Sequence, residues 1–276
     1  MPLQILQRRA FNAVQAGATL PATVGVPAGT TLTDLATLTV SANGQIVENK
    51  RFTGGSNGGV VVPAGVSGVV IRNCKFVGSG QSRGINTLNA SSVVTIQDCT
   101  FDGDFADEQL VGKNFSATRC EFLNFSNDAV KMGDNTSLTD SWIHAAHPLT
   151  GAHADGIQGI DTPYGVTVTN CLIDIGVDGT GGATPNSAVI ITPWTDVKPG
   201  PYNITFDHVT FGGGGFTFHV DLGNTDGITV RSCKFLSNVI YGRLQNLDGA
   251  TPIPSPAVWT GNVDQNGQPL AWTATG

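Results

Sequence analysis

The chain has 276 residues, a formal net charge of −7 and only 13% charged residues. It has no basic stripe, which argues against nucleic acid as a partner, and no stretch stays apolar for the roughly 18 residues that a membrane span requires. Residues Met1 to Gly17 place Arg8 and Arg9 before no apolar segment, so we expect no secretory signal peptide there.

The two ends of the chain differ from its middle. Residues 1–30 are rich in Ala, Thr and Pro, and we expect an N-terminal cap or docking segment, with a short helix at Leu3–Gln15. Residues 31–248 carry a repeat, and residues 249–276 leave it and are expected to form a C-terminal tail or cap. An open end of a repeat stack exposes strand edges and apolar core, so both tails are candidates to cover one.

One pattern recurs seven times, with mostly apolar residues at its first and third positions, a mostly polar fifth position and a cysteine slot at the sixth. The copies are Val69–Phe76, Val94–Phe101, Phe115–Phe122, Thr136–Ile143, Val166–Ile173, Ile204–Phe211 and Ile228–Phe235. Ser141 and Val209 fill the cysteine slot in two copies, and an earlier coil is readable at Gln45–Phe52 and Gly59–Val62. Intervals of 21 to 38 residues between slots indicate a solenoid.

The burial pattern changes phase inside each copy. In the first copy Val69 and Ile71 share one side of a strand, whereas Cys74 and Phe76 have the opposite parity. A straight strand cannot bury all four side chains, but a strand that bends at Asn73 can. Asn and Asp tolerate the left-handed backbone of such a bend. The bend column is Asn73, Asp98, Arg119, Asp140, Asn170, His208 and Ser232.

A third strand per coil is readable between the copies. The candidates are Ala129–Met132, Gly156–Ile160, Ala188–Ile191, Phe216–Val220 and Ile240–Leu244. We therefore predict an all-β chain folded as a single-stranded right-handed parallel β-helix, a solenoid of about ten coils with capping tails.

All five cysteines are expected to pack inside these coils as free thiols. An odd number does not suit a disulfide network, and no C-x-x-C pair is present for a zinc site. The cysteines therefore do not indicate a redox compartment.

Two adjacent coils are longer than the rest. The slot intervals are 30 residues from Ser141 to Cys171 and 38 residues from Cys171 to Val209, against a minimum of 21. Insertions in a solenoid usually map to its binding face. We expect the two extra loops to project from neighbouring coils and to wall a groove.

The catalytic candidates are His153, Asp155, Lys131 and His219, which we expect to converge on one exposed groove. A lyase needs a base that removes a proton next to a uronate carboxylate, and a group that neutralises that carboxylate. A hydrolase needs two carboxylates about 5–10 Å apart. Asp128 and Asp155 both precede a third strand and should stack one coil apart. Alternatively, these two acids stabilise the turns into their strands.

The substrate-binding candidates are Gln158, Asp128, Arg243, Trp194, His144 and His147. By alternation Lys131, Gln158, His219 and Arg243 point outward, and an aromatic ring such as Trp194 can stack on a sugar. Lys131 and Arg243 can equally be ordinary solvated residues. His144, His147 and His153 lack the helical spacing of a paired metal site, so we predict no metal site and leave the cofactor open, with a divalent cation such as Ca²⁺ as one option.

The rung pattern resembles the pectate-lyase-like parallel β-helix superfamily. More narrowly, PAGTTLT (Pro27–Thr33), GQIVENKRFTGG (Gly44–Gly55), HADGIQ (His153–Gln158) and VWTGNV (Val258–Val263) resemble a set of β-helix proteins from actinobacteria and their bacteriophages. The clustered calcium-binding acids and arginine base of pectate lyases do not map onto this sequence. The Asp-Asp and Gly-His-Gly signatures of polygalacturonase-type hydrolases are absent from it. Only the HADGIQ positions transfer as a site.

The resemblance implies a virion-associated protein, with a secreted protein as the alternative location. Its expected partners are a cell-surface or cell-wall polysaccharide and other virion proteins, with a homotrimer as the expected assembly. Because this step rests on fold analogy, three hypotheses stay open. The protein is a polysaccharide lyase or hydrolase, a glycan-binding module without turnover, or a structural minor tail or decoration protein.

Overall fold

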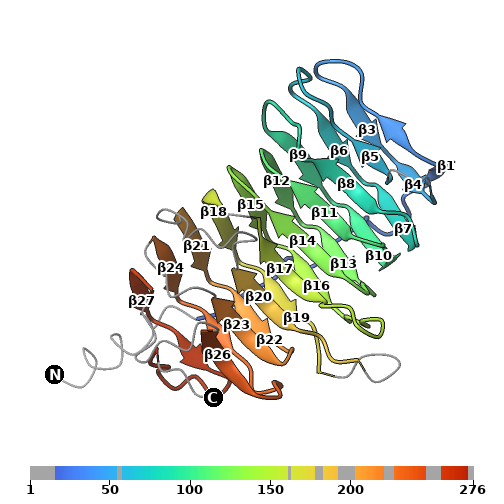
Figure 1. Cartoon of the computed structure of the whole chain (residues 1–276). Coiled ribbons are helices and arrows are strands. Elements are labelled where there is room, and N and C mark those ends of the chain that lie inside the picture. Colours follow the sequence, from blue (N-terminus) through green and yellow to red (C-terminus); the bar gives the residue numbers. More distant parts are fainter. Residues whose placement is uncertain are drawn as a thin grey trace, which may run out of the picture.

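The computed structural model describes residues 16–54, 58–160, 163–177, 183–191, 203–220, 227–246 and 256–272. In these ranges the chain winds into a rod of stacked coils whose strand pairs are all parallel (Figure 1), the right-handed parallel β-helix that the sequence predicts. None of the described segments forms a helix long and apolar enough to cross a bilayer. The expected helix at Leu3–Gln15 lies outside the described residues.

Three parallel sheets form the sides of the rod, and each strand pairs with its equivalent one coil further on. Sheet A contains β1 (Thr33–Leu35), β4 (Lys50–Phe52), β7 (Lys75–Ser79), β10 (Thr100–Asp104), β13 (Glu121–Leu123), β16 (Trp142–His144), β19 (Leu172–Asp174), β22 (Thr210–Gly212), β25 (Lys234–Phe235) and β28 (Val263–Asp264). Sheet B contains β2 (Leu38–Thr39), β5 (Val60–Val61), β8 (Arg83–Thr87), β11 (Glu108–Gly112), β14 (Asp128–Met132), β17 (Asp155–Gly159), β20 (Ser187–Ile191), β23 (Phe216–Val220) and β26 (Gly242–Asn246). Sheet C contains β3 (Ile46–Glu48), β6 (Val70–Arg72), β9 (Val94–Gln97), β12 (Phe115–Thr118), β15 (Thr136–Thr139), β18 (Tyr164–Thr169), β21 (Asn203–Asp207), β24 (Ile228–Arg231) and β27 (Val258–Thr260).

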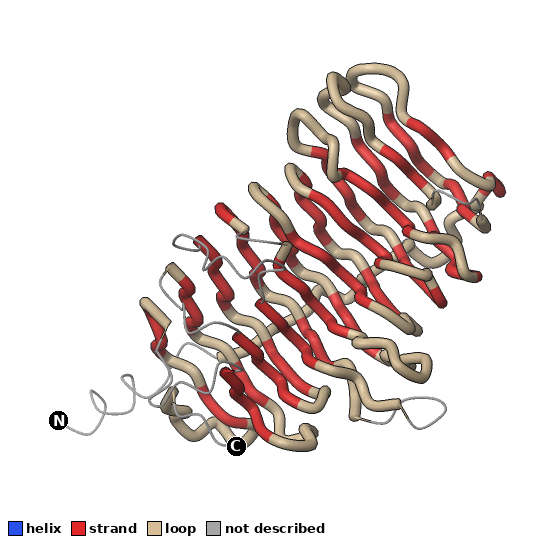
Figure 2. Tube along the Cα trace, viewed as in Figure 1, coloured by secondary structure: helices blue, strands red, loops and turns tan. Residues whose placement is uncertain are grey.

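Each coil runs from sheet C through sheet A to sheet B, and strands alternate with connecting loops along the rod (Figure 2). The turn from sheet C to sheet A, here called the C–A corner, is the predicted bend. All seven predicted bend residues have a left-handed backbone with φ between 51° and 54°. Asn49 (φ 54°) and Gly261 (φ 65°) make the same turn in the coils before and after the seven copies.

The core confirms the predicted inward position of the cysteines. All five cysteines are free and have no exposed surface. Each thiol lies near the backbone carbonyl two residues earlier, as between Cys74 Sγ and Arg72 O at 3.2 Å, and so helps to satisfy a carbonyl at the bend. Beside the thiols the rings of Phe52, Phe76, Phe101 and Phe122 stack at 4.6–4.9 Å, close to the roughly 4.8 Å between strands.

The solenoid continues into residues 249–276, which we expected to leave the repeat. In that segment β27 pairs with β24 and β28 pairs with β25. The apolar end of the rod is then covered by two tryptophans. The rings of Trp259 and Trp272 lie 5.0 Å apart, and Trp259 Nε1 donates to Leu270 O at 2.7 Å.

Residues 16–30, here called the strap, run along the outside of the C–A corner instead of covering an end of the rod. Gly17 N donates to Ser232 O at 2.8 Å, Asn170 exchanges side-chain hydrogen bonds with the backbone of Thr19, and Gly25 N donates to Arg119 O at 2.9 Å. The strap therefore passes from late coils to early coils, opposite to the direction in which the coils are wound.

Candidate functional site

The connections from sheet A to sheet B, here called the A–B corner, differ greatly in length from coil to coil. Residues 80–82 join β7 to β8, whereas residues 145–154 join β16 to β17 and residues 175–186 join β19 to β20. The two long connections belong to the coils with the longest slot intervals. They lie in adjacent coils and wall a pocket of about 570 Å³, as the interval pattern predicts.

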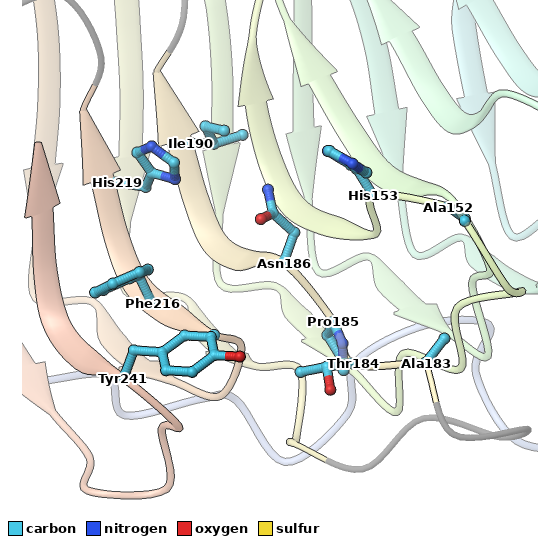
Figure 3. Close-up of a pocket in the computed structure, with 12 residues that line it drawn as sticks. Ala152, His153, Ala183, Thr184, Pro185, Asn186, Ile190, Phe216, His219 and Tyr241 are labelled. Atoms are coloured by element: carbon cyan, nitrogen blue, oxygen red, sulfur yellow. The ribbon is translucent and has the colours of Figure 1, made fainter. Parts of the chain in front are cut away.

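This cavity, here called the C-terminal pocket, extends over the coils of β17, β20, β23 and β26. Figure 3 shows His153, Asn186 and His219 on consecutive coils, with Phe216 on the same strand as His219 and Tyr241 in the next coil. The full lining is Gly151, Ala152, His153, Ala183, Thr184, Pro185, Asn186, Ile190, Gly215, Phe216, His219 and Tyr241. Apolar walls with a few polar groups are typical of a small-molecule or sugar site.

Two aromatic rings from adjacent coils form one end of the pocket. The centroids of Phe216 and Tyr241 lie 5.6 Å apart, and 67% of Tyr241 is exposed. Tyr241 lies against Gly215 of the preceding coil, where a Cβ would come within 3.3 Å of the tyrosine ring. The absence of a side chain at Gly215 thus leaves room for the exposed ring of Tyr241, on which a sugar ring can stack.

His219 places an unused polar atom in the pocket. Only 4% of the residue is exposed, its Nδ1 lies 3.3 Å from Ser187 Oγ, and its Nε2 is buried with no hydrogen-bond partner. Burial lowers the pKa of His219 to about 4, so the imidazole is neutral at pH 7. A neutral imidazole offers one donor and one acceptor, and a buried polar atom without a partner is costly. Nε2 therefore has hydrogen-bonding capacity that no described group uses.

Asn186 links the pocket to the predicted pair of acids. Its Nδ2 donates to Asp155 Oδ1 at 2.9 Å, and Asp155 N donates to Asp128 Oδ1 at 3.0 Å. The two acids stack one coil apart, as expected, but both are buried, with 2% and 3% of Asp155 and Asp128 exposed. Neither acid lines the pocket, and Asp155 is linked to it through the hydrogen bond from the lining residue Asn186.

Asp128 belongs to a buried ion cluster on sheet B. Lys131 Nζ lies 3.0 Å from Asp128 Oδ2 and 2.8 Å from Glu108 Oε1, and Arg83 Nε lies 2.7 Å from Glu108 Oε2. Burial raises the pKa of Asp128 to about 6 although Lys131 opposes the shift, and burial together with the charge of Asp128 raises the pKa of Asp155 well above its ordinary value. For Lys131, burial acts to lower the pKa, but the two acids outweigh it and the pKa is raised.

The four catalytic candidates do not share one pocket. His153 and His219 line the C-terminal pocket, Asp155 contacts its lining residue Asn186, and Lys131 lies in the ion cluster. The binding candidate Gln158 pairs with Lys131 across sheet B and is 8% exposed. The expectation that these side chains converge on one exposed groove is therefore met only by the two histidines.

Arg243 does not occupy the outward column of Lys131, Gln158 and His219. The register pairs Gln245 with His219, and Arg243 donates from Nε to Leu236 O at 3.1 Å. The reason is local to sheet B. Two successive residues point inward in its strands, as fully buried Ala188 and Val189 do in β20, so the expected alternation shifts by one.

The other two predicted histidines belong to the same coil as His153, and one of them lines a second cavity of about 520 Å³, here called the N-terminal pocket. His147 lines this pocket, and its Nε2 lies 2.9 Å from Asp104 Oδ1. His144 stacks on Trp142 at 3.8 Å and lies 3.2 Å from Glu121 Oε1. The predicted Trp194 lies outside the described residues.

Sequence reasoning missed Asn186, Phe216 and Tyr241 as lining residues, and Glu108 as the second acid beside Lys131. One signal was present in the sequence. Asn186 immediately precedes a third strand, the predicted His153 lies two residues before one, and the predicted Asp155 begins that strand. Tyr241 had no such signal, since its orientation depends on the glycine one coil earlier.

The lining limits the chemistry. No Asp, Glu, Lys or Arg is among the described residues that line the C-terminal pocket. Within the described ranges no group of three or more His, Cys, Asp or Glu side chains is placed to hold a metal ion. What the described residues offer is an aromatic surface, the hydroxyl of Thr184, the amide of Asn186 and two imidazoles. This set suits recognition of a hydroxyl-rich ligand.

No family model and no curated protein matches the sequence. Among solved structures, the fold is similar to the tailspike protein gp49 from Acinetobacter baumannii bacteriophage Fri1, a capsular polysaccharide depolymerase. The match has a TM-score of 0.50 and 16% sequence identity, and it covers 80% of this chain and 42% of the tailspike. The chain thus spans less than half the length of that tailspike, and at this identity the likeness concerns the fold.

Proposed function

We propose that this protein is a polysaccharide-binding β-helix component of a phage particle, and that it holds a sugar chain in the C-terminal pocket. The observation that carries the proposal is the combination of the Phe216–Tyr241 aromatic end with the unpartnered Nε2 of His219 in one cavity. Sugars present both apolar ring faces and hydroxyl groups, so this combination matches their two kinds of surface. The tailspike-like fold supports the same assignment.

Binding without cleavage fits the pocket better than hydrolysis or elimination. A glycosidase needs two carboxyl groups that reach the scissile bond, and the stacked acids Asp128 and Asp155 are instead buried and bonded to Lys131 and Asn186. A lyase needs a cationic group that neutralises a uronate, and the described lining contains no lysine or arginine.

The finer parts of the proposal rest on resemblance. The HADGIQ segment at His153–Gln158 resembles β-helix proteins of actinobacteria and their bacteriophages, and the rung pattern resembles the pectate-lyase-like superfamily. On this proposal the protein sits in the tail or tail tip beside other virion proteins, assembles as a homotrimer and contacts a polysaccharide of the host surface.

The proposal is tested by titrating the full chain with purified cell-surface polysaccharides. We expect Tyr241→Ala to weaken binding about tenfold, which corresponds to about 1.4 kcal/mol, because the variant removes half of the aromatic end. Tyr164→Ala is the matched control, because Tyr164 is also an exposed tyrosine (58%) but lies on sheet C. Equal loss in both variants, or no loss in Tyr241→Ala, contradicts the assignment of the pocket.

The same samples separate the other hypotheses. New reducing ends would indicate a hydrolase, and ultraviolet absorbance of an unsaturated product would indicate a lyase; either result refutes binding without cleavage. If no polysaccharide binds at all, the structural role in the virion becomes the better explanation.

A further inference from the structure

We infer that the C-terminal and N-terminal pockets are two ends of one groove, and that this groove selects an uncharged polysaccharide. The inference rests on the proposed function and adds the substrate class and the length of chain that is bound. It starts from the connection 145–154 between β16 and β17. Ala145, Ala146 and His147 line the N-terminal pocket, and Gly151, Ala152 and His153 line the C-terminal pocket.

Both pockets therefore lie along the same edge of the rod. The N-terminal pocket is lined by residues of β7 and β10 and by residues that follow β13 and β16, all at the A–B corner. The C-terminal pocket begins in the coil of β16 and β17 and continues this corner over the next three coils. The pocket centres are about three coils apart, or roughly 14 Å at 4.8 Å per coil. One sugar ring cannot reach both centres, whereas an oligosaccharide laid along the rod can.

The charge around the C-terminal pocket disfavours an anionic sugar. His219 is neutral at pH 7, and the described lining contains no lysine or arginine. The carboxyl group of Asp155 accepts a hydrogen bond from the lining residue Asn186. A bound uronate would lose its hydration without gaining a cation, which is costly. A neutral hydroxyl group can instead use Nε2 of His219.

The N-terminal pocket disfavours an anion even more strongly. Asp102, Asp104, Asn124 and His147 provide its polar lining. The cation nearest to Asp102 is Lys75, whose Nζ lies 2.9 Å from Asp102 Oδ2 and is thereby already paired. Carboxylates accept hydrogen bonds from sugar hydroxyls but repel other carboxylates. In addition, His147 Nδ1 is buried without a hydrogen-bond partner. The two pockets thus agree in the class of sugar that they accept.

The inference is tested by titrating the full chain with oligosaccharides of increasing length. The uncharged probes are β-glucan, mannan and galactan fragments, and the acidic probes are polygalacturonate and alginate fragments of equal length. We expect binding from the uncharged class, with at least a tenfold gain in affinity once a fragment is long enough to span both pockets. Any cell-surface polysaccharide that binds the full-length protein is also tested before and after chemical reduction of the polysaccharide's carboxyl groups.

Two variants separate the pockets. His147→Ala should lose the gain with length, whereas Tyr241→Ala should weaken binding of fragments of all lengths. Asp104→Asn should reduce the discrimination against acidic fragments severalfold, because it removes one repelling charge. Unchanged melting temperatures show that the variants are folded.

The failures are distinguishable. Preferred binding of acidic fragments, or a gain with length that His147→Ala does not alter, overturns this inference and leaves the proposed function in place. Absence of binding by both classes and by every polysaccharide overturns the proposed function itself, and this inference with it.

Discussion

The C–A and A–B corners of the same coils have opposite characters. At the C–A corner every coil turns at one left-handed residue, from Asn49 to Gly261, and the strap lies along the outside of that turn. At the A–B corner the connection grows from residues 80–82 to residues 175–186, and both pockets lie there. The C–A edge of the solenoid is therefore constant, whereas the length of the A–B edge varies from coil to coil.

The physical cause of this difference is burial. The C–A turn carries the cysteine slot directly into the core, so one added residue would reverse which side chains are buried. The A–B connections differ in length, yet the strands on either side of the long ones keep their pairing in sheets A and B. Variable exposed connections on a rigid frame are where proteins usually place binding residues.

The largest expected effect is on the free energy of unfolding, when ion pairs near the two corners are removed one at a time. Lys131→Met should lower the free energy of unfolding by about 3–5 kcal/mol at neutral pH, because it leaves the buried Asp128 and Glu108 without Lys131. Arg119→Met at the C–A corner removes a more exposed pair with Asp98 and should cost about 1 kcal/mol or less. Chemical denaturation measures both. Similar losses in the two variants would show that the cluster near the pockets is not buried as described.

The second prediction is the pH dependence of stability that buried Asp128, near the A–B corner, should cause. Because the pKa of Asp128 is raised to about 6 in the folded chain, the protonated form of Asp128 adds to the free energy of unfolding. This contribution is complete below about pH 4 and is lost as pH rises through about 6. Asp128→Asn lacks this dependence, so its stability relative to wild type should improve by up to roughly 3 kcal/mol between about pH 4 and pH 8.

His219 supplies the control for that profile. Its pKa is lowered to about 4, so its contribution has the opposite sign and is lost as pH falls through the range from about 6.5 to 4. Both wild type and Asp128→Asn contain His219, so its contribution cancels when their stabilities are subtracted. The His219→Gln variant should lose this contribution altogether. Parallel stability profiles for Asp128→Asn and wild type would mean that Asp128 has no raised pKa.

The smallest expected difference, between two glycine variants, tests how closely the strap packs on the C–A corner. A Cβ on Gly25 would lie 2.5 Å from Thr100 Oγ1, whereas one on Gly29 would meet no atom within 4 Å, and the two residues have nearly the same φ of 81° and 82°. Gly29→Ala should cost about 1 kcal/mol from its backbone alone. Gly25→Ala should cost about 1–3 kcal/mol more. Equal shifts in denaturation midpoint would place the strap away from the corner.

The sequence predicts the regular edge well and the variable edge poorly. The bend at Asn73 and its equivalents follows from a phase change in the burial pattern, and all seven predicted positions have the left-handed backbone. The predicted third strands agree with β14, β17, β20, β23 and β26 to within two residues at their starts. These features depend on short-range alternation, which a single sequence displays.

The candidate site depends on features that alternation does not display. Arg243 was misplaced because sheet B buries two successive residues, and a reading with period two cannot anticipate that shift. The pairing of His153 with His219 in one pocket came from loop length and alternation together. The contributions of Phe216 and Tyr241 required the path of the connections in three dimensions.

The central claim is that the A–B corner binds a polysaccharide and the C–A corner does not. Hydrogen–deuterium exchange of the full chain, with and without a polysaccharide that binds it, tests this most directly. We predict slower exchange in residues 145–154 and 183–186 and in the start of β23, with no change in the strap or at the bend residues. Protection of the strap or of sheet C, with residues 145–154 and 183–186 unchanged, would contradict the claim.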